Sequence, residues 1–296
     1  MIKKKSNSKM ESLDKHAYCI MAHGNWKQLQ LLVTLIDDSR NDIYLHIDAK
    51  SVDDYIAMGG VSVCNSHLKL IKSEDVRWSD ISQADVEVEL FRAVCHSGEE
   101  YSRIHLISGA DLPIKSQDDI HDFFKDKQEE FIDISAPSQY IRRIKYYHFF
   151  VRERRKRRWA EIMRKVLILL QVPFINRLKK CPLQYAYGAN WCSLTQRAVK
   201  EIVDKWVVYR PIFTHSTSCD ELYKQMILLS AGNFKFAKEG CLRYVDFSSQ
   251  QPSPKTLRME DYDKIIGSNC VFARKFNINV DKEIVDKITK LDKCHN

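Results

Sequence analysis

Glycine and proline are scarce in this sequence, with 9 and 7 residues among 296. Long linkers and disordered tails are rich in such residues and poor in apolar ones, whereas 44% of this chain is hydrophobic. We therefore expect one folded domain over residues 16–296. Residues 1–15 are polar and basic with no apolar run behind them. They predict a flexible N-terminus that is neither a signal peptide nor a membrane anchor.

Long apolar runs are missing as well. The longest, residues 166–172, is far shorter than the roughly 18 residues that a membrane-spanning helix needs. Nine cysteines occur, but no two of them form the C-x-x-C pair that is typical of zinc or redox sites. We expect reduced thiols in a cytoplasmic protein.

The glycine-rich loops G-x-G-x-x-G and G-x-x-x-x-G-K-[ST], which bind nucleotide phosphates, are also absent. What the chain does contain is apolar strands interspersed with amphipathic helices. The patterns predict strands at 17–23, 42–48, 67–71 and 101–108 and helices at 26–38 and 79–97. This order predicts an α/β fold with a doubly wound sheet. Ligands bind such sheets beyond the carboxyl ends of the strands, where Asp48 and the turn 108–111 lie.

The second half is less regular, with helices predicted at 194–206, 220–230 and 259–267, a strand-like segment at 241–247 and a terminal stretch around 272–276. Between the two halves, residues 141–180 hold fourteen Lys and Arg against Glu153 and Glu161, a net charge of +12. The whole chain is only +8, so the remainder is −4. We predict a basic helical insertion at about 150–180 that contacts an anionic membrane surface. A solvated charged helix is the alternative, and we expect no nucleic-acid partner.

Ten short strings carry a further signal: AYCIMAH (17–23), LHIDAKS (45–51), Trp78…Ser82…Ala84, HLISGADLPIKSQDDI (105–120), IKYYHF (144–149), YGANWCSLT (187–195), DELYKQMIL (220–228), LRYVDFS (242–248), SPKTL (253–257) and FARKF (272–276). In this order they resemble the core-2/I-branching family of glycosyltransferases. Its animal members are β-1,6-N-acetylglucosaminyltransferases, and it includes peptide xylosyltransferases and many bacterial relatives.

The resemblance implies a GT-A type fold, a Rossmann-like mixed sheet flanked by helices. It also implies an enzyme that moves a sugar, GlcNAc being the commonest, from a UDP-sugar to a hydroxyl of a glycan acceptor with inversion. Xylose, galactose or galactofuranose stay open as donors, as does a non-catalytic basic module for membranes or RNA. By likeness to the bacterial members, we expect surface-polysaccharide assembly on a lipid-linked acceptor at the inner face of the plasma membrane.

Many GT-A enzymes hold the donor diphosphate with a metal on an Asp-x-Asp motif, and no such motif follows a predicted strand here. The resembling family uses basic side chains instead, which stabilise developing charge as a metal would. Matched residue by residue, these are Lys275 in FARKF and Lys255 in SPKTL, with Arg258 as the alternative to Lys255. We therefore expect neither a divalent metal nor another cofactor.

An Asp-Glu pair begins the predicted helix at 220–230. In general, such a pair caps a helix and complements its dipole. The family places its catalytic carboxylate in this pair, so the resemblance implies Asp220 as the cap and Glu221 as the general base.

The remaining candidates also come from the resemblance, and for each a purely structural role is the alternative. Phe247 stands where animal members carry a Trp that stacks on the acceptor. The donor-side residues are Asp48, Trp78 and Asp111, and the acceptor-side residues are Phe247, Arg142, Lys145 and Trp191.

Overall fold

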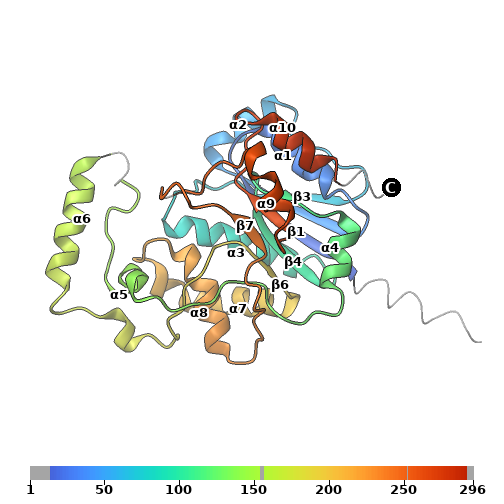
Figure 1. Cartoon of the computed structure of the whole chain (residues 1–296). Coiled ribbons are helices and arrows are strands. Elements are labelled where there is room, and N and C mark those ends of the chain that lie inside the picture. The colour runs from blue at the N-terminus through green and yellow to red at the C-terminus, as the bar shows by residue number, and fades with distance from the viewer. Residues whose placement is uncertain (1–13, 154–156, 252, 292–296) are drawn as a thin grey trace, which may run out of the picture.

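The computed structural model describes residues 14–153, 157–251 and 253–291 (Figure 1). Most of the predicted flexible N-terminus and three basic residues of the predicted insertion, Arg154, Arg155 and Lys156, lie outside this part.

A five-stranded sheet of order β3-β2-β1-β4-β6 forms the centre. Its strands are β1 (His16–Ala22), β2 (Asn41–Ile47), β3 (His67–Ile71), β4 (Arg103–Ser108) and β6 (Cys192–Leu194). The first four are parallel, and β6 pairs antiparallel with β4. Every residue of β1, β2 and β4 is buried, as expected for parallel strands that are covered on both faces. The predicted mixed α/β fold is confirmed.

Helices cover both faces of this sheet (Figure 1). Side chains alternate between the faces along a strand, so Ala17 and Cys19 join one core and Tyr18 and Ile20 the other. The first core is completed by α3 (Ile81–Cys95), α7 (Gln196–Phe213) and α8 (Tyr223–Ala231). The second is completed by α1 (Trp26–Leu35), α4 (Gln117–Phe124), α9 (Tyr262–Ile266) and α10 (Lys282–Thr289).

A smaller sheet of order β5-β8-β7 adds the C-terminal part of the chain. Its strands are β5 (Leu112–Pro113), β7 (Arg243–Val245) and β8 (Phe272–Arg274). Because β5 follows the turn after β4 and pairs with β8, the strand carrying the FARKF string lies beside the carboxyl end of the central sheet.

Several predicted boundaries were wrong at helix ends. The helix predicted at 26–38 ends at Leu35, and the one predicted at 194–206 continues to Phe213. The helix predicted at 220–230 is divided into a 3-10 turn, η5 (Cys219–Glu221), and α8. The segment 259–267 is divided in the same way into η6 (Met259–Asp261) and α9.

The predicted basic insertion contains α6 (Arg158–Gln171) and the 3-10 turn η4 (Arg177–Lys180), and it follows the short helix α5 (Arg142–Lys145). We call its described residues 150–153 and 157–180 the arm. Figure 1 places α6 at the outer edge of the molecule, away from the central sheet. Among the described residues, no helix combines the length and apolarity that a bilayer crossing requires.

Candidate active site

Asp48 directly follows β2 at the carboxyl edge of the sheet, where the strand pattern predicts it. Its side chain accepts the Lys50 backbone N–H at 2.9 Å and forms an ion pair with Lys50 Nζ. The same Nζ lies 2.6 Å from Asp75 and donates to the Val76 carbonyl at 2.7 Å. Asp48 is 6% exposed, so its carboxylate is already neutralised and largely covered within the protein.

The segment 74–80 connects this edge to the loop that carries Glu221. At one end, the backbone N–H of Ala49 donates to the Glu74 carbonyl at 3.1 Å. At the other, Ser218 N–H donates to the Ser79 carbonyl at 2.9 Å, and the two serine hydroxyls lie 2.7 Å apart. Both serines have positive φ, which is uncommon outside glycine and is held here by these contacts. Trp78 lies in this segment and is 46% exposed.

Glu221 lies on η5 with its side chain 29% exposed. It forms a close ion pair with Arg143 of α5, and its carbonyl accepts the Gly188 N–H at 3.1 Å. Burial lowers the pKa of Arg143, but the Glu221 carboxylate more than offsets this, so that the pKa of the guanidinium is raised. A general base must be a carboxylate or similar group that a hydroxyl can reach, and this carboxylate is partly exposed and held in one orientation by a guanidinium.

Two stacked tyrosine rings also contact the Arg143 guanidinium. Tyr140 and Tyr187 lie with ring centroids 4.3 Å apart, and the guanidinium is 4.5 Å from the first ring and 5.4 Å from the second. Burial and the nearby Glu221 carboxylate raise the pKa of the Tyr187 hydroxyl. The sequence analysis missed Arg143 and singled out its neighbours instead. Arg142 is exposed above the Tyr146 ring, and Lys145 lines a cavity beside the arm, so neither contacts Glu221.

A fully buried polar network lies beneath the Glu221 loop. Lys224 Nζ pairs with Glu87 at 2.5 Å, and both side chains are completely buried. The ammonium also donates to Asn190 Oδ1 at 2.6 Å and to the Asp220 carbonyl at 3.0 Å. Tyr223 donates to Glu87 at 2.9 Å. Because a buried charge is costly unless it is paired and hydrogen-bonded, this network fixes the backbone next to Glu221.

Asp220 does not cap a helix, contrary to the prediction. The residue before α8 is Leu222, and no side chain caps that helix. The Asp220 side chain points inward instead, with one oxygen accepting from Gln83 at 3.0 Å and the other buried without a hydrogen-bond partner. Burial, then the charges of Glu221 and Glu87, raise the pKa of Asp220 to about 7. The preference of Asp for helix starts is therefore outweighed here by the burial of its side chain in the folded protein.

Asp111 was predicted to contact the donor, but it is completely buried. It accepts hydrogen bonds from Ser108, one from the backbone N–H at 2.8 Å and one from the hydroxyl at 3.1 Å, and it pairs with Arg274 at 3.1 Å. The Arg274 guanidinium also lies 4.4 Å from the centroid of the Trp191 ring. Asp111 therefore supports the strand that carries Lys275 rather than facing a ligand, because its carboxylate is fully engaged.

Lys275 follows β8 directly and is half-buried. Its carbonyl accepts the Leu257 N–H at 2.9 Å, and the next residue, Phe276, donates its N–H to Ala110 at 2.9 Å. Lys275 thus lies beside the turn after β4. In the part of the chain that the structure describes, it forms no ion pair, so its charge is available to an anion.

Lys255 differs from Lys275 in this respect. Its Nζ pairs with Glu260 at 2.8 Å and Asp261 at 3.0 Å, and these hydrogen bonds raise its pKa. Arg258 is exposed, with its backbone N–H donating to Asp261 at 2.9 Å. The structure therefore favours Arg258 over Lys255 as the second available cation. Phe247 lies on the same loop, after β7, and is 57% exposed.

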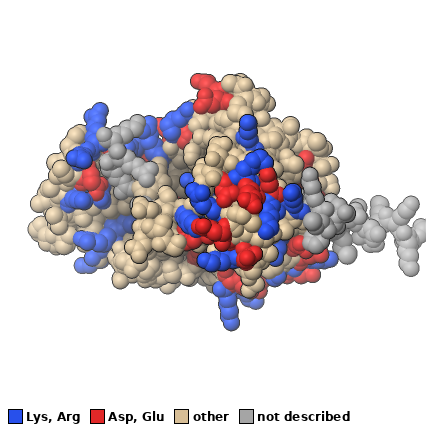
Figure 2. All heavy atoms as spheres, turned by 45° about the horizontal axis from the view of Figure 1, so that its top comes forward, with Lys and Arg blue, Asp and Glu red and all other residues tan. Residues whose placement is uncertain are grey.

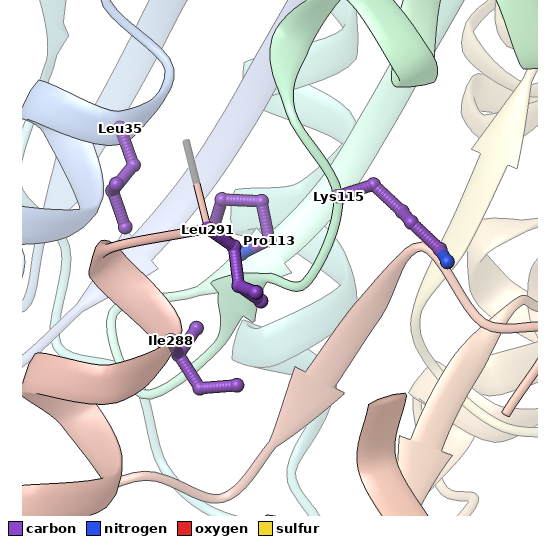
Figure 3. A pocket seen from close by; sticks show the side chains of 5 residues that line it. All are labelled: Leu35, Pro113, Lys115, Ile288 and Leu291. Carbon is purple, nitrogen blue, oxygen red and sulfur yellow. The ribbon is translucent and has the colours of Figure 1, made fainter. Parts of the chain in front are cut away.

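Two other features lie apart from this set. Asp14, His16 and His121 form the only group of three potential metal ligands found within the described ranges, and it lies at the amino end of β1. The two imidazole rings are stacked with centroids 3.9 Å apart, so their lone pairs run nearly parallel instead of converging on one ion. Figure 3 shows a small recess between Leu35, Pro113 and α10, which has no space for a water molecule.

Comparisons with known proteins were made for the whole chain. A family model described as "Core-2/I-Branching enzyme" matches residues 16–266, a range that includes Glu221 but ends before Lys275. Among solved structures, the chain is similar to mouse xyloside xylosyltransferase 1 in its apo form, at 10% identity and a TM-score of 0.40, covering 89% of this chain and 98% of the other. No curated protein sequence matches.

Proposed function

The chain belongs to the core-2/I-branching enzyme family of glycosyltransferases, and on this premise we propose that it transfers a sugar from a UDP-sugar to a glycan hydroxyl with inversion and without a divalent metal. The observation that carries the proposal is the Glu221 carboxylate, partly exposed and paired with Arg143 on a loop that a buried network holds in place. GlcNAc is the donor that we propose first.

In this mechanism, the acceptor hydroxyl attacks the anomeric carbon from the face opposite the diphosphate. Its proton passes to the Glu221 carboxylate as the new C–O bond forms, and the bond from the anomeric carbon to the diphosphate oxygen breaks with its electron pair. A positioned base supplies about 10²–10⁴-fold in rate. Arg143 acts through Glu221, because its guanidinium pairs with the carboxylate and orients it.

The departing UDP carries negative charge that must be stabilised. Lys275 is proposed for this task because it is unpaired among the described residues and lies beside the carboxyl edge of the sheet. Arg258 is the proposed second cation, and Lys255 would have to leave Glu260 and Asp261 first. Asp48 and Trp78 are proposed on the donor side. Phe247 and Trp191 are proposed on the acceptor side, and the Trp191 ring stacks with the Arg274 guanidinium.

The proposal is tested by incubating the protein with UDP-GlcNAc and, separately, with the UDP derivatives of xylose, galactose and galactofuranose, each with EDTA and with Mn²⁺. We expect UDP release from UDP-GlcNAc at the same rate in both conditions, and a product with inverted anomeric configuration by NMR. A large loss in EDTA that Mn²⁺ restores would contradict metal independence, and release from another donor alone would replace GlcNAc.

The setting that we propose is the assembly of a surface polysaccharide, with a lipid-linked glycan as the acceptor. The support for it is the basic arm, which lies next to α5 and therefore next to Arg143 in the chain.

A further inference from the structure

Helix α6 of the arm carries its large apolar residues on the face that points away from the rest of the protein. Six large apolar side chains are 42–65% exposed: Trp159, Ile162, Met163, Val166, Leu169 and Leu170. They are spaced three or four residues apart, so they form one continuous stripe along the helix. A surface helix ordinarily turns such a stripe towards the core, whereas this stripe faces outwards.

The inner face of α6 is held by polar contacts. The Gln171 amide is buried, donating to the Tyr147 carbonyl at 3.0 Å and accepting the Tyr147 N–H at 2.7 Å. Arg164 pairs with Glu161 at 2.7 Å across one turn of the helix. The buried residues of α6 are Gln171 and the small Ala160, so its large apolar side chains are not needed to seat the helix, and the stripe is left facing outwards.

The stripe continues into the turn after α6 and is flanked by cations. Phe174 is 87% exposed, more than any other large apolar side chain of the described residues. Arg158 and Lys165 border the stripe along one side of the helix, and Lys179 and Lys180 are exposed on η4. In Figure 2 the charged side chains at the left, where the arm lies, are mainly basic, whereas basic and acidic side chains are mixed over the body.

A cavity of about 830 Å³ opens at the C-terminal end of α6. Its lining repeats the composition of the stripe, with apolar groups from Val172, Phe174 and Pro211 and cationic groups from Lys145, Lys179 and Lys180. Apolar and cationic groups thus alternate from the helix to the cavity, which is the pattern that an amphiphile with an anionic head group would match.

We propose that the arm docks on a membrane that contains anionic lipid, with the α6 stripe and Phe174 inserted at the boundary between head groups and acyl chains. An amphipathic helix with a cationic border binds an interface in this way. The positive charge of the arm favours anionic lipid over a second copy of the chain as the binding partner. Two arms in contact would bring like charges together, whereas anionic lipid neutralises them. The docking does not depend on the chemistry at Glu221 and stands or fails separately from the proposed function.

The test is co-sedimentation of the full-length protein with vesicles of phosphatidylcholine alone and of phosphatidylcholine with phosphatidylglycerol. The protein should bind the anionic vesicles, release at high salt, and leave the neutral vesicles unbound. Ile162→Ser/Leu169→Ser/Leu170→Ser should weaken binding more than about tenfold, since insertion free energy scales with buried apolar area. Lys165→Gln/Lys179→Gln/Lys180→Gln should weaken it by about fivefold for each charge removed near the surface.

Helix α7 offers a matched control, because Val207 and Val208 are 73% and 66% exposed and Lys200 and Lys205 are exposed on the same helix. Val207→Ser/Val208→Ser and Lys200→Gln/Lys205→Gln should leave vesicle binding unchanged. All variants should keep the melting temperature and the activity on a soluble acceptor. Absence of binding at low salt, or equal losses in arm and control variants, would overturn the proposal. A dimer in sedimentation velocity that the serine variant abolishes would assign the stripe to a second copy instead.

Discussion

The loop around Glu221 and the arm use the same types of charged side chain in opposite ways. Beneath the loop, Lys224 and Glu87 form an ion pair that is completely buried and hydrogen-bonded on all sides. In the arm, Lys165 is 68% exposed and lies 3.8 Å from Glu161. The buried pair fixes a backbone position, because neither charge can be left alone there. An exposed pair contributes little to stability, so its cation can exchange the carboxylate for an external anion at little cost.

The apolar residues of the Glu221 loop and of the arm also differ in burial. Around the loop, Cys219, Leu222 and Tyr223 are fully buried in the core that α3 and α7 share. On α6, the apolar stripe faces outwards. We infer that the loop is built for rigidity and the arm for contact. Changes in the loop should therefore affect catalysis or folding, and changes in the arm only docking.

The largest effect is expected from Glu221→Gln, which keeps the shape of the side chain but cannot accept a proton. Transfer should fall by about 10²–10⁴-fold, while UDP binding and the melting temperature stay close to those of the original protein. The measurements are initial rates, titration with UDP and thermal unfolding. Glu89→Gln is the control, because Glu89 is also an exposed carboxylate paired with an arginine, Arg92. An active but destabilised Glu221→Gln would assign Glu221 a structural role.

Lys224→Met should have the next largest effect, on folding. It leaves Glu87 charged, buried and unpaired, which costs about 3–5 kcal/mol, measured as the free energy of unfolding in urea. Lys165→Met removes the exposed cation of the pair with Glu161 and should cost at most about 0.5 kcal/mol. The double variant Glu87→Gln/Lys224→Met should recover part of the loss, because no unpaired charge is then left. Equal small losses at both sites would remove the distinction between the two regions.

Lys275→Ala should reduce kcat by about 10²-fold, comparable to the loss of one donor to a developing charge. It should weaken binding of UDP more than that of uridine, because uridine lacks the phosphates. The affinities for UDP and uridine are measurable by calorimetry. If UDP and uridine lose affinity equally, Lys275 supports the structure of the site and does not contact the diphosphate.

The effect expected from Asp220→Asn depends on pH and vanishes at low pH. Because the pKa of Asp220 is raised to about 7 from an ordinary value near 4, the folded protein holds this proton to a higher pH than the unfolded chain does. The stabilisation is complete below about pH 4 and is lost as the pH rises through 7.

Asn carries no such proton, so the variant should gain stability relative to the original protein between pH 4 and 7, by at most about 1.4 kcal/mol per pH unit. Urea unfolding at several pH values measures this slope. The slope should shrink in a Glu221→Gln background, because the Glu221 charge contributes to the raised pKa of Asp220. A difference that does not change with pH would contradict the assignment.

Helices and strands were predictable from the sequence where the spacing of apolar residues is sufficient to identify them. The strand predicted at 67–71 is β3, and the strands at 17–23, 42–48 and 101–108 are recovered within two residues at each end. The helix predicted to end at Trp206 runs on to Phe213 although Pro211 lies inside it. Proline is unfavourable inside a helix, and no sequence rule shows that packing of Phe213 in the core compensates for it.

Of the candidate site, only the residues that lie within recognisable sequence motifs were predictable. Glu221 and Lys275 came from strings of neighbouring residues, whereas Arg143 reaches Glu221 across 78 positions that no local pattern connects. For Asp220, the local rule for a helix start suggested a cap, but the Glu87 and Lys224 side chains that surround it come from separate helices. Long-range contacts such as these become visible only in the folded chain.

The central position of β1 also has a consequence for how the chain folds during synthesis. His16 pairs with Arg103 of β4, and Ile104 of β4 pairs with Leu194 of β6. Contacts between residues so distant in sequence form late, because closing a long loop costs entropy before any contact compensates for it. The arm lies between β4 and β6, so the ribosome completes the apolar stripe of α6 before the edge strand arrives. A nascent chain therefore exposes this stripe while the sheet is still incomplete, which is the interval in which exposed apolar surface is most prone to aggregation.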